Sequence, residues 1–151
     1  MTTFEKLYRL YESYEQFSYD YLLSLAKEKA EYIFRMMRST DGTDTASKYL
    51  LAFSALLAAC NLNISEKSYD FFVAATGINL FSYEQFKQFA KKISGEFEVR
   101  MMFRETANEK NFSSEFDNSL FIYALAFTAC DGKINDSERR FILENVPFGD
   151  I

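Results

Sequence analysis

The chain has 151 residues, of which 48% are hydrophobic and 26% charged, values typical of one globular domain. The net charge of −5 gives no basic surplus for nucleic-acid binding, and the absence of histidine excludes His-based catalytic triads, general bases and metal ligands. Five glycines and one proline are too few for a turn-rich β fold, so the composition predicts an all-α protein.

The N-terminal third of the chain predicts two helices followed by a loop. Apolar and aromatic residues recur at helical spacing over Thr3–Phe17, where Thr3 can cap the helix, and again over Tyr19–Arg38. The polar segment 39–44 contains Gly42 and predicts a loop.

Two long apolar helices are expected to form the centre of the core, the first over Ala46–Cys60 and the second over Ser119–Cys130. Two further helices are expected between them. Ser65 can cap a helix that stops at Gly77. Ser82 opens another, because Gln85 completes a capping-box pattern with it.

The remaining expected elements lie on either side of the second apolar helix. Residues 97–107 have a helical pattern, and residues 108–114 predict a loop. Asn135 can cap a last helix, which ends before Pro147. Together these elements predict a compact bundle of about seven to eight helices in a single domain, 1–151. This domain is expected to consist of an N-terminal helical extension, 1–43, and a repeat-containing core, 44–145.

The core contains a pseudo-repeat with an offset of 70 residues. Ala59–Ser68 and Ala129–Glu138 each follow a long apolar helix, turn through an isoleucine and open a second helix, so each copy predicts a helix–turn–helix unit. Cys60 and Cys130 occupy equivalent positions. A core role is expected for both, and a disulfide requires the two units to pack symmetrically.

The turn between the second pair of helices carries Asp131, Gly132 and Glu138. It resembles half of a calcium-binding EF-hand loop, but Phe127 and Ala129 stand where the first two ligands would be, which excludes an ordinary EF-hand. Two interpretations stay open. Asp131 and Glu138 either stabilise the turn and cap the helix, or they converge with other oxygen atoms on a divalent cation.

The two units resemble the tellurite-resistance TerB-like family, whose members carry an Ala-x-Asp-Gly-x-Ile-x-x-x-Glu turn in each half and include the cytosolic portion of a membrane-anchored DnaJ-type cochaperone. Ala129–Glu138 matches this pattern, whereas Ala59–Ser68 departs from it at Asn61, Leu62 and Ser68. The resemblance implies an all-α fold with two related halves, no catalytic activity, and a role in stress response, phage defence or chaperone-linked complexes.

The resemblance also implies a divalent-cation site, for Ca²⁺ or Mg²⁺. By position, its ligands would be Asp131 and Glu138, with Asn61 and Ser68 as weaker equivalents in the first unit. The loss of two carboxylates from the first unit should weaken such a site, because affinity depends on ligand charge.

Two functions therefore remain open for a chain that is expected to be non-enzymatic. The first is a TerB-like module that binds a cation and acts through a protein partner. The second is a metal-free interaction or self-association domain, for instance a homodimer, that uses a tyrosine-rich surface. Six of the ten tyrosines lie in the first 32 residues: Tyr8, Tyr11, Tyr14, Tyr19, Tyr21 and Tyr32. The sequence shows neither a signal peptide nor a transmembrane span, so a cytoplasmic location is expected.

Overall fold

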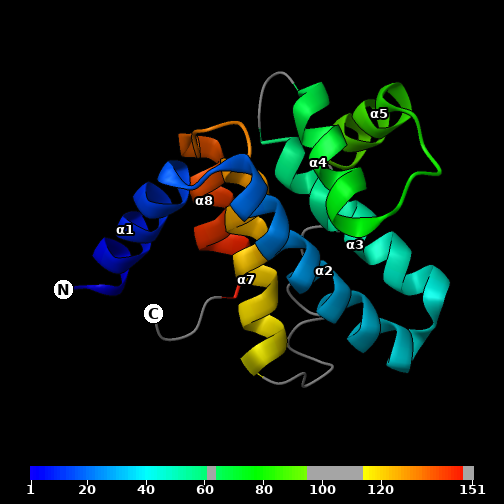
Figure 1. Cartoon of the computed structure of the whole chain (residues 1–151), viewed down its shortest axis with the longest axis horizontal. Helices are drawn as coiled ribbons and strands as arrows, with labels where there is room; N and C mark the ends of the chain where they lie inside the picture. Colours follow the sequence, from blue (N-terminus) through cyan, green and yellow to red (C-terminus); the bar gives the residue numbers. More distant parts are fainter. Residues whose placement is uncertain (61–63, 95–113, 148–151) are drawn as a thin grey trace.

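The computed structural model describes residues 1–60, 64–94 and 114–147, and in these ranges the chain forms seven helices and no strand. The predicted all-α bundle is thereby confirmed (Figure 1). The helices are α1 (Thr3–Gln16), α2 (Tyr19–Asp41), α3 (Thr43–Ala58), α4 (Glu66–Thr76), α5 (Tyr83–Ser94), α7 (Ser114–Ala129) and α8 (Asp136–Asn145). The predicted helix 97–107 and most of the predicted loop 108–114 lie outside the described residues.

The helix ends follow the capping signals of the sequence, with one shift. Ser65 accepts a hydrogen bond from the backbone of α4, and the Ser82–Gln85 capping box forms in both directions, at 2.9 and 3.2 Å. The expected cap at Thr3 is wrong by one residue. Thr2 Oγ1 accepts the bond from the amide of Glu5 instead, at 3.1 Å, which makes Thr3 the first helical residue.

The loop predicted over residues 39–44 is also wrong, because α2 continues to Asp41 and α3 begins at Thr43. Ser39 Oγ donates to Met36 O at 2.7 Å, and Thr40 Oγ1 donates to Met37 O at 3.2 Å. Their hydroxyls are therefore satisfied within the helix. Only Gly42, with φ of 92°, separates the two helices, and its positive φ reverses the chain there.

The long helix α2 lies against both helix–turn–helix units, α3–α4 and α7–α8. Helix α2 packs against α3, α4 and α7, so it is part of the core that both units share. Figure 1 shows α2 crossing α7, with α1 and α8 on one side and α3, α4 and α5 on the other. Helix α5 packs on the first unit, through α3, and α1 packs on the second, through α7.

The two apolar helices meet at a buried hydrogen bond between Ser54 of α3 and Tyr123 of α7. The two hydroxyl oxygens are 2.6 Å apart, and both residues are fully buried. A buried hydroxyl that loses its partner keeps its desolvation cost.

The change Tyr123→Phe should therefore lower the free energy of unfolding by about 1.5 kcal/mol, measured by urea denaturation. The double variant Tyr123→Phe/Ser54→Ala should lose little further stability, because the second change removes the Ser54 hydroxyl that the first change leaves without a partner. Full additivity of the two single changes would show that this hydrogen bond does not couple the helices.

None of the helices in the described ranges has the combination of length and apolar character needed to span a bilayer.

Candidate functional site: the acidic turn and the α3–α8 pocket

The turn between α7 and α8 is built by hydrogen bonds of its own residues. Gly132 has φ of 100°, and its amide donates to Ala129 O at 2.9 Å, which closes the end of α7. The amide of Lys133 lies 3.4 Å from Asp131 Oδ1. Asp131 is exposed, so its carboxylate supports the turn at the surface.

Glu138 forms a capping box with Asn135 at the start of α8. The amide of Glu138 donates to Asn135 Oδ1 at 2.8 Å, and the amide of Asn135 donates to Glu138 Oε1 at 2.9 Å. The predicted cap is thus confirmed. Glu138 is only 2% exposed, so its carboxylate is enclosed where the helix N-terminus stabilises it.

The capping role predicts different effects for two substitutions of Glu138. Glu138→Gln retains an acceptor oxygen and should change the melting temperature little. Glu138→Ala leaves the Asn135 amide without its partner and should lower stability by about 1.5 kcal/mol in thermal or urea unfolding. Equal losses from the two substitutions would instead indicate that the charge of Glu138, and not its capping oxygen, stabilises the turn.

A second carboxylate holds the same turn from a distant part of the chain. Glu15 of α1 accepts the amide of Ile134 at 2.9 Å through Oε2, and its Oε1 pairs with the guanidinium of Arg139 at 3.0 Å. Arg139 also donates from Nε to Ile134 O at 2.8 Å. The Tyr11 hydroxyl donates to Arg139 O at 2.9 Å, so α1 is fastened to the acidic turn by several charged and neutral hydrogen bonds.

Arg139 also packs against aromatic rings of α1. Its guanidinium carbon lies 5.0 Å from the Tyr8 ring centre and 5.2 Å from that of Tyr11, and both contacts are cation–π interactions. Neither Glu15 nor Arg139 was predicted as a site residue. Their separation of 124 positions leaves no local pattern by which sequence reasoning could have paired them.

In the first unit, the position equivalent to Glu138 is also part of a helix cap. Ser68, which corresponds to Glu138, is 3% exposed, and its amide donates to Ser65 Oγ at 3.0 Å. The two Oγ atoms of Ser65 and Ser68 are 2.9 Å apart. Ser68 therefore completes a serine cap in the place of the Asn-x-x-Glu box. Asn61 lies outside the described residues.

The structure brings the two turns together at the thiol of Cys130. Burial, followed by the charge of Asp131, raises the pKa of Cys130 to about 12, and Glu138 adds to this effect. A hydrogen bond from Ser68 and the charge of Lys67 oppose the rise. Three of the four predicted ligands, Asp131, Glu138 and Ser68, thus influence the pKa of one buried thiol. Cys130 forms no disulfide with Cys60.

The arrangement of these side chains bears on cation binding. Within residues 1–60, 64–94 and 114–147, no three acidic or cysteine side chains converge in a way that could hold a metal ion. Glu138 Oε1 and Ser68 Oγ take part in caps, and Asp131 is exposed at the surface of the turn. The described geometry favours the structural interpretation of the acidic turn.

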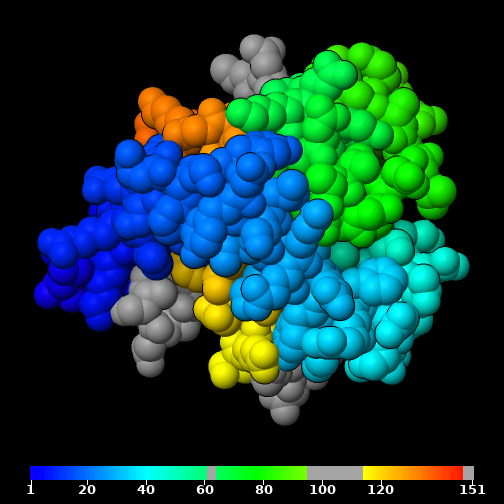
Figure 2. Space-filling view, in the orientation of Figure 1, coloured from blue at the N-terminus to red at the C-terminus, as the bar shows by residue number. Residues whose placement is uncertain are grey.

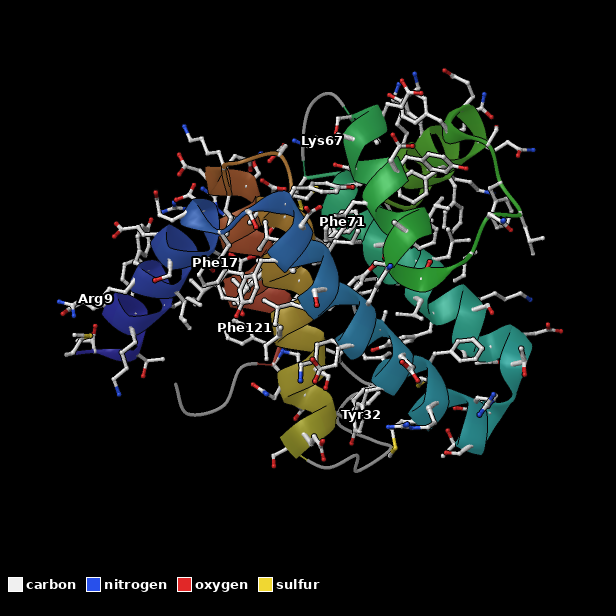
Figure 3. The ribbon with its side chains drawn as sticks, viewed as in Figure 1. Arg9, Phe17, Tyr32, Lys67, Phe71 and Phe121 are labelled. Atoms are coloured by element: carbon white, nitrogen blue, oxygen red, sulfur yellow. The ribbon has the colours of Figure 1, made fainter. Side chains whose placement is uncertain are left out.

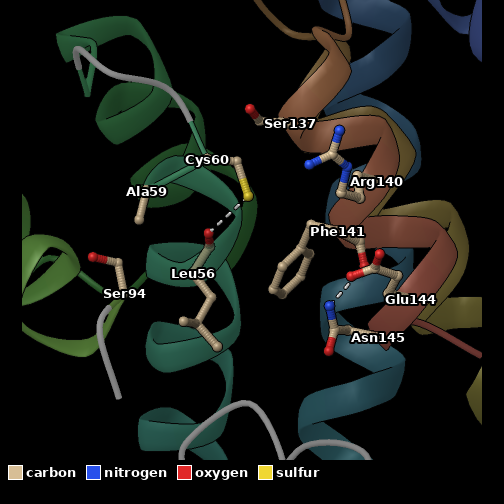
Figure 4. A pocket seen from close by; sticks show the side chains of 9 residues that line it. All are labelled: Leu56, Ala59, Cys60, Ser94, Ser137, Arg140, Phe141, Glu144 and Asn145. Atoms are coloured by element: carbon tan, nitrogen blue, oxygen red, sulfur yellow. Dashed lines mark hydrogen bonds between the residues drawn. The ribbon is translucent and has the colours of Figure 1, made fainter. Parts of the chain in front are cut away.

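A pocket of about 360 Å³ lies between the end of α3 and α8, on the side where the second unit faces the first. Figure 4 shows the Phe141 ring extending from α8 toward Leu56 of α3, with Arg140 facing Cys60 across the opening. The residues that line it are Leu56, Ala59, Cys60, Ser94, Ser137, Arg140, Phe141, Glu144 and Asn145.

Comparison of the chain with models of protein families, with curated proteins and with solved structures gives no match. The TerB-like resemblance therefore rests on the turn residues and on the two units that carry them.

Proposed function

We propose that the protein is a non-enzymatic helical module, TerB-like in its organisation, that acts by binding another protein. The proposal is supported by the structural roles of two carboxylates and of the buried thiol. The carboxylates of Glu15 and Glu138 hold the backbone of the acidic turn. Cys130 is the most enclosed thiol, and its raised pKa keeps it protonated and therefore a poor nucleophile.

The observation that carries the proposal is an exposed aromatic surface where α1 meets α2. At this junction Phe17 is 37% exposed and Tyr21 50%. The rings of Phe17 and Tyr21 are in contact, with centres 4.8 Å apart. We call these two residues the N-terminal aromatic corner. Large exposed rings of this kind are enriched in protein interfaces.

The other N-terminal tyrosines pack on the core. Tyr11 and Tyr14 are buried against the core, and burial raises the pKa of both phenols. The candidate interface is therefore the aromatic corner and not the whole tyrosine-rich segment. Figure 2 shows α1 at one end of the molecule, with the start of α2 next to it on the visible face.

The partner that the corner fits best is a second copy of the chain. Exposed residues of both charges lie along α1, the helix that leads to the corner: Glu5, Lys6, Arg9 and Glu12. Two such helices that pack antiparallel can place Arg9 of each beside Glu12 of the other, as in a two-fold symmetric interface in which each contact occurs twice. The TerB-like resemblance would put such an assembly in a stress or defence response.

Sedimentation velocity over a range of protein concentrations tests this function. The protein should form a dimer that dissociates on dilution, and the double variant Phe17→Ser/Tyr21→Ser should remain a monomer. Leu143→Ser is the matched control, because Leu143 is 40% exposed but lies on α8, and it should leave the dimer intact. A wild-type protein that is monomeric at all concentrations would contradict self-association through the corner.

A further inference from the structure

The α3–α8 pocket has a counterpart in the first unit, and that counterpart is filled by Tyr19 of α2. The Tyr19 ring packs edge-on against Phe71, with centres 5.7 Å apart, and Lys67 Nζ lies 5.4 Å from the centre of the Tyr19 ring. Burial raises the pKa of the Tyr19 phenol, and the charges of Cys130 and Asp70 act in the same direction. Phe71 and Lys67 therefore contact this ring, and Cys130 and Asp70 lie near enough for their charges to act on its hydroxyl.

The repeat offset of 70 gives each of these four neighbours an equivalent residue in the other unit. Phe71 corresponds to Phe141, Lys67 to Ser137, Asp70 to Arg140, and Cys130 to Cys60. All four equivalents line the pocket. The pocket is thus the second copy of the site that holds Tyr19.

The two copies differ in how far their phenylalanine is covered. Phe71 is fully buried, and its ring contacts both Tyr19 and Phe127. Phe141 is only half-buried and faces the pocket. Figure 3 shows Phe71 enclosed between α2 and α4. In the described part of the chain no ring takes the place of Tyr19 in front of Phe141, and the pocket can accept an aromatic side chain.

The charge of the pocket indicates what accompanies that side chain. Lys67 and Asp70 balance each other beside Tyr19, whereas Ser137 and Arg140 leave one positive charge at the equivalent positions. Glu144 also lines the pocket, one helical turn beyond Arg140, but no ion pair joins these two among the described side chains. An occupant with a carboxylate beside its ring would pair with the guanidinium of Arg140.

We infer that the pocket docks the first turn of a partner's helix in which an aromatic residue is followed directly by aspartate or glutamate. Tyr19–Asp20, which opens α2, is the internal example of this sequence. The ring would pack edge-on against Phe141, as Tyr19 packs against Phe71, and the carboxylate would bind Arg140 beside the Ser137 hydroxyl. The inference rests on the proposed function as a protein-binding module, and it names the chemistry of a partner at a surface separate from the aromatic corner.

Cys60 provides a direct test, because it lines the pocket. Acetyl-Tyr-Asp, acetyl-Tyr-Lys and acetyl-Ala-Asp are each coupled through the C-terminus to cystamine, and the protein is equilibrated with each probe in excess 2-mercaptoethanol. The Cys60 thiolate attacks the probe disulfide, forms a mixed disulfide and releases cysteamine, so the labelled fraction reports the affinity of the attached group. The raised pKa of Cys130 disfavours reaction there, and peptide mapping confirms the labelled site.

We expect acetyl-Tyr-Asp to label Cys60 at least about fivefold more than either other probe. Arg140→Gln should abolish its advantage over acetyl-Tyr-Lys, whereas Lys92→Gln, the same charge change at an exposed position of α5, should not. Equal labelling by the three probes, or a preference that Arg140→Gln leaves unchanged, would overturn the inference. Either outcome is independent of the dimer test at the aromatic corner, so the failure of one proposal is distinguishable from the failure of the other.

Discussion

Replacing Phe71 with alanine is expected to lower the free energy of unfolding by about 4 kcal/mol, whereas the same change at Phe141 should cost only about 1 kcal/mol. The two residues occupy equivalent positions in the repeat. Phe71 is fully buried between Tyr19 and Phe127, so its loss leaves a cavity. Phe141 borders a pocket that is already open, so its loss removes fewer contacts. Urea denaturation of both variants measures the difference.

The Phe71 and Phe141 variants test the asymmetry between the units, because the chemical change is identical in both. Circular dichroism should show native helix content for each variant before denaturant is added. Similar losses of stability at the two positions would mean that Phe141 is as well packed as Phe71, and the α3–α8 pocket would then be closed in solution.

The second large effect is expected at the connection between α1 and the acidic turn. Arg139→Met should lower the free energy of unfolding by about 3 kcal/mol, because the change leaves the partly buried carboxylate of Glu15 without its cation. The methionine keeps much of the apolar contact with Tyr8 and Tyr11, so the loss reports mainly on charge and hydrogen bonds. Thermal and urea unfolding both measure it.

Arg140→Met is the matched control for Arg139→Met, since Arg140 is the next residue on α8 and is exposed. It should change stability by less than about 0.5 kcal/mol. A double-mutant cycle of Arg139→Met with Glu15→Gln should give a coupling energy of more than about 1 kcal/mol. Independent effects of the two substitutions would show that the pair does not fasten α1 to the turn.

The fold could be predicted from sequence because its signals are local. The two apolar helices, the serine cap at Ser65 and the Asn135–Glu138 box each need only a few neighbouring residues, and all of them form. The loop predicted around Gly42 was wrong, because its polar composition does not reveal that Ser39 and Thr40 bond back to their own helix.

The candidate site could be predicted only in part, because a carboxylate that caps a helix and one that binds a cation occupy the same sequence pattern. The geometry around Glu138 favours the capping interpretation, since its Oε1 accepts the amide of Asn135. The pairing of Glu15 with Arg139 depends on how α1 docks, and the α3–α8 pocket depends on which helix covers each unit. Neither is encoded at short range.

The role of the acidic turn as a structural element is tested most directly by thermal melts of metal-stripped protein with and without millimolar Ca²⁺ or Mg²⁺. A cation that binds only the folded state raises the melting temperature by mass action. We predict a shift of less than about 1 °C with either ion, because the oxygen atoms of Glu138 and Ser68 are engaged in helix caps. A rise of several degrees that Asp131→Ala abolishes would contradict this account and establish a cation site at the turn.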